Sequence, residues 1–149
     1  MLEKSYVMVK PEFANHENVI EIIKNQLIEN ADLTLLKAGY IRYTNEDAKK
    51  HYAEHVGKDF YPNLEEYITS DKAYGMVVEG ENAIAKIRAL VGATKNPAEG
   101  TIRYEIPKLL GLELRVTQNV VHASDSPISA EREIAIFEDV LNKTNEMGF

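Results

Sequence analysis

Residues 119–126, Asn-Val-Val-His-Ala-Ser-Asp-Ser, form a short apolar run that ends in small and polar residues. The apolar part predicts a buried strand over residues 119–123, with His122 inside it. Ser126 is suited to cap a helix, and Pro127 is suited to the first helical position. Apolar side chains then recur on one helical face at Ile134, Phe137 and Leu141. The stretch therefore predicts a strand that passes directly into an amphipathic helix.

The upstream part of the chain alternates between strand-like and helix-like segments. Runs rich in β-branched and aromatic residues predict strands at residues 6–9, 33–43 and 74–78. Apolar spacing and capping residues predict helices at residues 17–29, 45–55, 64–68 and 82–91. We expect a bulge at Gly39 and a helix N-cap at Asn45. The order β-α-β-α-β-α-β-α predicts an α+β fold, in which helices pack on a four-stranded sheet.

Residues 93–118 show no regular periodicity. This segment is interrupted by Pro97, Gly100, Pro107 and Gly111. Long stretches without regular structure are uncommon in compact domains and are usually functional loops. We therefore expect an irregular functional loop here.

Length and composition indicate one globular domain spanning residues 1–149. The formal net charge of -7 argues against a nucleic-acid or anionic membrane surface. The chain has no cysteine, which excludes a disulfide framework and a thiolate metal site. Neither a signal peptide nor an apolar run long enough to span a bilayer is visible. We therefore expect a cytoplasmic protein with no membrane partner and no need for nucleic acid.

His122 is the strongest candidate for a catalytic residue. An unperturbed imidazole has a pKa of about 6.5, so a neutral, nucleophilic nitrogen is available near neutral pH. The helix that starts at Pro127 brings Glu133 close in sequence, and a carboxylate on the other ring nitrogen would fix the tautomer. We interpret His122 as a nucleophile that accepts a phosphoryl group. The alternative is a hydrogen-bonded structural histidine, which is the commoner role for a lone histidine at a strand end.

The chain lacks the glycine-rich loops that bind phosphate through backbone amides. A phosphate site must therefore be built from side chains, and the candidates are Lys10, Arg88, Thr94 and Arg103. Arginine forks bind phosphate oxygens in pairs through charge-assisted hydrogen bonds. For each arginine alone the alternative is a surface salt bridge, and for Lys10 a solvated strand end.

Three further side chains are candidates for ligand contacts. Tyr52 and His55 are three residues apart, so they share one helical face, although an ordinary exposed face has the same spacing. Phe60 lies in a polar break and is suited to stack on a base or to cap the core. Asn119 is placed to bond a sugar hydroxyl. Strict alternation puts Asn119 and His122 on opposite faces, so a shared site requires a bend or bulge between them.

Taken together, these residues resemble the nucleoside diphosphate kinase family from about residue 5 to residue 137. The most specific match is residues 119–126 followed by residues 129–134, Ser-Ala-Glu-Arg-Glu-Ile. The family has a closely similar Asn-x-x-His-Gly/Ala-Ser-Asp-Ser run, with its glutamate at the same distance. Supporting matches are residues 9–11, 51–52, 79–83, 88–94, 96–97 and 100–103.

The resemblance implies a ferredoxin-like fold with a four-stranded antiparallel sheet, and a ping-pong reaction. His122 would carry the γ-phosphoryl group of a nucleoside triphosphate, typically ATP, to a nucleoside diphosphate. Glu133 would orient His122, with Ser124 beside that carboxylate. The resemblance also implies phosphate binding by Arg88, Thr94, Arg103 and His55, and contact of Tyr52 with the transferring phosphoryl group. Lys10 and Asn119 would contact the ribose and the bridging region of the nucleotide. Phe60 and Val116 would pack on the two faces of the base.

The resemblance also implies a homo-oligomer and Mg²⁺ that travels on the nucleotide phosphates, with no protein metal cage. The chain departs from the family at residues 70–72, Ser-Asp-Lys, where Ser-Gly-Pro is usual. It also has Lys95 inserted in the Thr-Asn-Pro loop and a longer segment over residues 104–115. Two alternatives stay open, namely a catalytically silent nucleotide sensor and a phosphohistidine transferase with a non-nucleotide acceptor.

Overall fold

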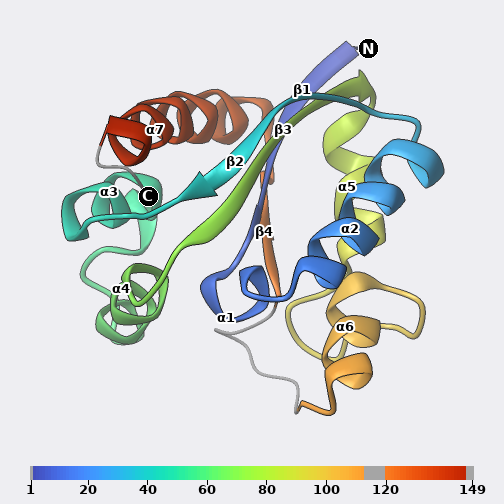
Figure 1. The fold of residues 1–149 in the computed structure, drawn as a ribbon, viewed down its shortest axis with the longest axis horizontal. Coiled ribbons are helices and arrows are strands. Elements are labelled where there is room, and N and C mark those ends of the chain that lie inside the picture. The colour runs from blue at the N-terminus through green and yellow to red at the C-terminus, as the bar shows by residue number, and fades with distance from the viewer. Residues whose placement is uncertain (1, 113–119, 147–149) are drawn as a thin grey trace.

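The computed structural model of the protein describes residues 2–112 and 120–146. The described residues form a four-stranded antiparallel sheet in the order β2-β3-β1-β4 (Figure 1). The strands are β1 (Leu2–Val9), β2 (Thr34–Ile41), β3 (Ala73–Glu81) and β4 (Val121–Ala123). The predicted ferredoxin-like α+β fold is therefore confirmed.

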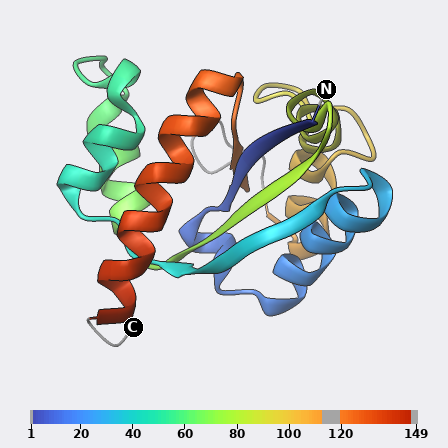
Figure 2. The same cartoon turned by 90° about the horizontal axis from the view of Figure 1, so that it is seen from above.

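Helices cover both faces of this sheet. One layer contains α2 (Glu17–Asn25), continued by a π-helical turn at Gln26–Asn30, with α5 (Ala83–Val91) and α6 (Ile102–Leu110). The other layer contains α3 (Asn45–His51), α4 (Tyr61–Thr69) and α7 (Pro127–Glu146). Short turns at α1 (Pro11–Ala14) and at the 3₁₀ helix Ala53–His55 connect these elements. Figure 2 shows the sheet between the two layers.

The central strand β1 contributes side chains to both hydrophobic cores. Its alternating side chains point to opposite faces, as the twofold period of a strand requires. Val7 and Val9 join the core beneath α2 and α5. Tyr6 and Met8 join the second core beneath α3 and α7, where Phe137 lies against Tyr6 with ring centroids 5.2 Å apart. The second layer, which includes α7, therefore lies on the face to which Tyr6 points.

The prediction of irregular structure over residues 93–118 is wrong for residues 102–110, which form α6. Ile102 and Ile106 are four residues apart and buried against the core, so the segment has an apolar helical face. Pro107 lies inside the helix, and a proline within a segment usually argues against a helix there. Burial of the apolar face outweighs the lost backbone hydrogen bond.

Two local predictions are corrected. The N-cap of α3 is Thr44, not Asn45, because its hydroxyl accepts from the Asp47 amide while the Asp47 carboxylate accepts from the Thr44 amide. The irregularity in β2 lies between Leu35 and Lys37, not at Gly39. Gly39 instead allows a close approach of α7.

In the part of the chain that the structure describes, every helix is too short or too polar to cross a bilayer.

Candidate active site

His122 lies in the middle of β4 and pairs with Met8 of β1. Its neighbours Val121 and Ala123 are buried in the core beneath α2 and α5. Alternation therefore turns the imidazole toward the opposite face, where its ring centroid is 6.3 Å from that of Tyr6. The His122 side chain is 20% exposed, so it is held by the fold but reachable from solvent.

Val120 introduces a bend immediately before β4. Its φ of 78° is rare for a β-branched residue, and its side chain is fully buried. The Val120 carbonyl accepts from the Lys10 amide at 2.9 Å, which ties the bend to the end of β1. This bend lies between Asn119 and His122, where a site shared by both residues requires one. Asn119 itself, like Val116, lies outside the described residues.

A buried carboxylate contacts His122. Oε2 of Glu133, on α7, lies 2.9 Å from Nε2 of His122, along a direction that departs from a straight N–H···O line. The Ser124 hydroxyl donates to Oε1 of Glu133 at 2.7 Å and accepts from the Tyr6 amide at 3.0 Å. Glu133 is 3% exposed and Ser124 is fully buried. The strand and the helix therefore hold one rigid His–Glu–Ser constellation, which leaves Nδ1 as the ring nitrogen that Glu133 does not contact.

Arg103 connects three segments around His122. Its guanidinium donates to the Gly92 and Val121 carbonyls, each at 2.9 Å, and to the Thr94 hydroxyl at 3.4 Å. Burial and then the nearby charge of Arg88 lower the pKa of Arg103 to about 10. Arg88 itself is exposed on α5. This clustering of positive charge next to β4 is suited to an anionic ligand.

Lys10 is buried at the end of β1 and is only 6% exposed. Burial, followed by the charge of Arg103, lowers the pKa of Lys10 to about 7. The alternative of a solvated strand end is therefore wrong. An anionic ligand would neutralise the charges of Lys10 and Arg103 and so stabilise the protonated form of the buried Lys10.

A row of aromatic rings runs from His122 to the surface. Tyr52 is buried and lies 6.0 Å from His122, His55 lies 6.2 Å from Tyr52, and Phe60 lies 5.5 Å from His55, all between ring centroids. Phe60 is 49% exposed, so it does not cap the core. The row supplies an apolar wall that ends in an exposed ring.

His51, which was not among the predicted site residues, also lies in this neighbourhood. Its ring lies edge-on to that of His122, with centroids 4.6 Å apart, and it is 2% exposed. Burial, and then the charge of His122, hold its pKa well below the usual value for histidine. Ala48, His51 and Tyr52 share one buried face of α3, so helical spacing indicates that His51 faces inward but not that it lies beside His122.

The described site therefore brings together most of the predicted residues. Direct contacts or nearby rings and charges link His122, Glu133, Ser124, Lys10, Tyr52, His55, Phe60, Arg88, Thr94 and Arg103. The His122 imidazole contacts a buried carboxylate, and a cluster of cations lies close to the same strand. Such an arrangement is suited to group transfer from an anionic donor.

Comparison with known proteins gives one family. The family model for nucleoside diphosphate kinase matches residues 3–140. The nucleoside diphosphate kinase of Archaeoglobus fulgidus is 48% identical over 139 residues, which cover 91% of this chain and 86% of that protein. The corresponding protein of Halalkalibacterium halodurans is 42% identical over 141 residues, covering 93% and 90%. Among solved structures, a halophilic nucleoside diphosphate kinase from Halobacterium salinarum in complex with CDP has a TM-score of 0.80 at 34% identity, covering 92% and 88%.

Proposed function

We propose, from the premise that the chain belongs to the nucleoside diphosphate kinase family, that His122 passes a γ-phosphoryl group between two nucleotides. Family membership makes the chain a nucleotide-binding kinase, and the ping-pong steps on His122 are the proposal. The observation that supports them most directly is the contact of Nε2 of His122 with the buried Glu133 carboxylate. Since Glu133 engages Nε2, Nδ1 is the nitrogen available for the phosphoryl group.

In the first half-reaction the lone pair of Nδ1 forms a bond to the γ-phosphorus. The bond from that phosphorus to the β,γ-bridging oxygen breaks, and the nucleoside diphosphate leaves with the electron pair. The proton on Nε2 stays in place, and the Glu133 carboxylate balances the growing positive charge of the ring. In the second half-reaction a terminal oxygen of the acceptor diphosphate attacks the phosphorus, and the electron pair of the P–N bond returns to Nδ1.

Phosphoryl transfer depends mainly on in-line positioning and on neutralisation of oxygens. Lys10, Arg88 and Arg103, with the Thr94 hydroxyl, would hold the phosphates, and their closeness to one another supports this role. The aromatic row would guide the rest of the nucleotide, with Phe60 stacking on the base. Contacts of Val116 with the base and of Asn119 with the ribose are also part of the proposal, although both residues lie outside the described part of the chain.

We also propose that magnesium enters the site with the nucleotide, bound to its phosphates. In the described part of the chain, the one group of potential metal ligands contains two imidazoles and a single carboxylate, whereas Mg²⁺ prefers six oxygens. When bound to the phosphates, the ion neutralises their oxygens. We also propose that the chain acts as a single domain in a homo-oligomer, in the cytoplasm, without membrane or nucleic-acid partners.

Labelling with γ-³²P ATP tests this function and separates it from both alternatives. The protein should acquire acid-labile, base-stable label in the absence of an acceptor. GDP, CDP and UDP should each remove that label as labelled triphosphate. Absence of label would indicate a silent nucleotide sensor. Label that none of these diphosphates removes would indicate a transferase with a different acceptor.

The substitution Glu133→Gln should lower the rate of phosphorylation by about 100-fold while nucleotide affinity is largely kept. The amide can donate to Nε2 and so force the ring proton onto Nδ1, the nitrogen that must attack. Single-turnover labelling gives the rate, and calorimetric titration with ADP gives the affinity. Glu131→Gln, an exposed change on the same helix, is the matched control. Equal losses in rate and affinity would contradict an orienting role for Glu133.

Nucleotide binding should take up a proton through Lys10. In the free protein its pKa is lowered to about 7, and the phosphates of a bound nucleotide should raise it again. Binding therefore requires protonation above about pH 7, and affinity should fall with rising pH by up to about tenfold per unit. Below that pH, Lys10 is already charged in the free protein, and this dependence disappears.

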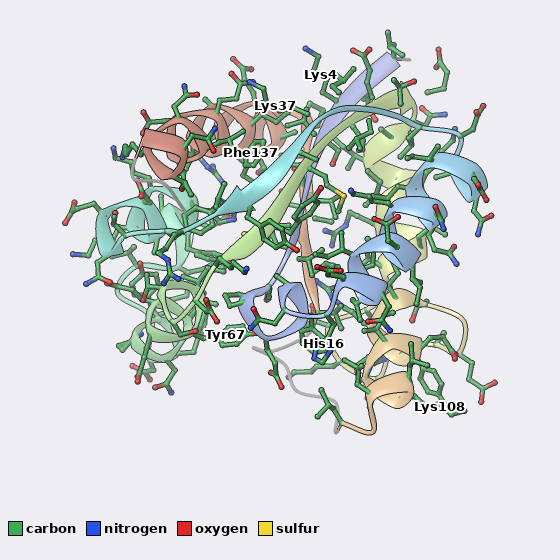
Figure 3. The ribbon with its side chains drawn as sticks, in the orientation of Figure 1. Lys4, His16, Lys37, Tyr67, Lys108 and Phe137 are labelled. Carbon is green, nitrogen blue, oxygen red and sulfur yellow. The ribbon has the colours of Figure 1, made fainter. Side chains whose placement is uncertain are left out.

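Calorimetric titration with ADP at about pH 8, in buffers that differ in ionisation enthalpy, measures this proton uptake. Lys10→Met should lose the uptake due to Lys10, whereas Lys4→Met should keep it. Lys4 is exposed on the same strand near its other end (Figure 3). Equal proton uptake in wild type and Lys10→Met would show that another group titrates.

A further inference from the structure

Three potential metal ligands converge from separate elements of the fold. His51 is the last residue of α3, His122 lies in β4, and Glu133 lies on α7. One ligand atom of each lies within 4.8 Å of the other two. His51 and Glu133 are 2% and 3% exposed, and His122 is partly open to solvent. The group is therefore built into the fold rather than formed by mobile surface side chains.

His51 is the unusual member of this group. Within residues 2–112 and 120–146, neither of its ring nitrogens has a hydrogen-bond partner, although both are fully buried. A buried polar atom without a partner costs about 1–3 kcal/mol, so such atoms are rare without a function or a bound species. The ring is held edge-on to Tyr52, with centroids 4.5 Å apart, and packs against Tyr6 and Tyr43. This packing keeps the imidazole beside His122.

We propose that His51, His122 and Glu133 form a binding site for a divalent transition-metal ion of the Zn²⁺ type. Two imidazole nitrogens and one carboxylate oxygen match the ligands that Zn²⁺, Ni²⁺ and Cu²⁺ prefer, and do not match Mg²⁺ or Ca²⁺. Bonds of about 2.0–2.1 Å place tetrahedral ligand atoms about 3.3 Å apart, so small side-chain rotations close the site. A water molecule would complete the tetrahedral set as the fourth ligand.

This ion would oppose phosphoryl transfer, an effect that rests on the proposed function. The ion would coordinate Nε2 of His122 and the Glu133 carboxylate, so it would replace the direct contact between them that orients the ring. A ring that has given a nitrogen lone pair to a metal is also a weaker nucleophile at its other nitrogen. The site is therefore inhibitory, and it is distinct from the magnesium that accompanies the nucleotide.

Arg132 provides a way to test the site by strengthening it. Its Nη2 lies 3.8 Å from Oε2 of Glu133, the carboxylate that the ion would share. Its positive charge disfavours a second cation there. Arg132→Met should therefore tighten metal binding, a gain that misfolding does not produce.

Calorimetric titration of the nucleotide-free protein with ZnCl₂, and separately with NiCl₂, measures binding directly. Wild type should bind one ion per chain, and His51→Phe should weaken binding by at least about 100-fold, because a ligand is lost while the ring volume is kept. His16→Asn should bind like wild type, since His16 lies at the start of α2 in the other helix layer (Figure 3). Unchanged affinity in His51→Phe, or no saturable binding in wild type, would overturn the site.

The fold of His51→Phe is checked by urea unfolding. Its free energy of unfolding should not fall, because an apolar ring replaces buried nitrogens that lack partners. If this variant does not fold, Arg132→Met decides, and unchanged or weaker zinc binding in it would refute the site.

Labelling with γ-³²P ATP and excess Mg²⁺ then separates this inference from the proposed function. Zinc should suppress labelling of wild type more than of His51→Phe. If the metal-free protein acquires no label but binds zinc through His51, the proposed function fails and the metal site stands. If labelling proceeds and zinc suppresses it equally in both proteins, the metal site fails and the function stands.

Discussion

Replacement of His122 by alanine is expected to remove phosphoryl transfer, with turnover at least about 10⁴-fold lower than in wild type. The substitution deletes the only atom that the proposal allows to bond to phosphorus, Nδ1 of this ring. The rest of the site does not depend on the ring, because Ser124 still holds Glu133 and Arg103 still binds the Val121 carbonyl. Nucleotide affinity should therefore change far less than turnover.

Steady-state transfer from ATP to a second diphosphate measures the loss, and the acid-labile label should disappear with it. His16→Asn is the matched control, since it removes an imidazole at the start of α2. Thermal unfolding of both variants checks that the alanine variant is folded, because it leaves the Glu133 carboxylate without its histidine. Persistence of label in folded His122→Ala would place the nucleophile on another residue.

Replacement of Arg103 by lysine is expected to cost both stability and activity, although the charge is kept. The guanidinium donates at the same time to the carbonyls of Gly92 and Val121, each at 2.9 Å. Hydrogen bonds from charged groups contribute about 1.5–3 kcal/mol each, and an ammonium cannot reproduce the planar fork. We expect the free energy of unfolding to fall by about 3 kcal/mol, since two such bonds are lost or weakened.

The substitution should also lower the rate of phosphoryl transfer, because Arg103 joins the segment that carries Thr94 to the strand that carries His122. Misplacement of a reacting group by about an ångström can lower the rate about 100-fold, so kcat/KM should fall by at least that factor. Urea unfolding and steady-state kinetics measure the two effects. Arg88→Lys is the matched contrast, because Arg88 is exposed on α5, and its free energy of unfolding should stay within about 0.5 kcal/mol of wild type. Equal stability losses in the two variants would contradict the connecting role of Arg103.

Local patterns were sufficient for most of the fold. Strand alternation, helical spacing and caps are set within a few residues, so the sequence predicted the four strands, the helix after Pro127 and their order. The failures also have local causes. Pro107 concealed α6, and Thr44 capped a helix for which Asn45 was the expected cap. In both, tertiary burial or a specific hydrogen bond outweighed the simpler signal.

The sequence by itself determined the chemical groups of the site, because His122, Ser124 and Glu133 lie within one strand-to-helix unit whose geometry is local. Only the tertiary structure decided which distant groups surround them. Elements far apart in the chain set three features of the site. These are the lowered pKa of Lys10, the hydrogen bonds of Arg103 to two segments, and the position of His51 beside His122. Sequence spacing carries no information about such approaches, which burial and packing of the two helix layers on the sheet create.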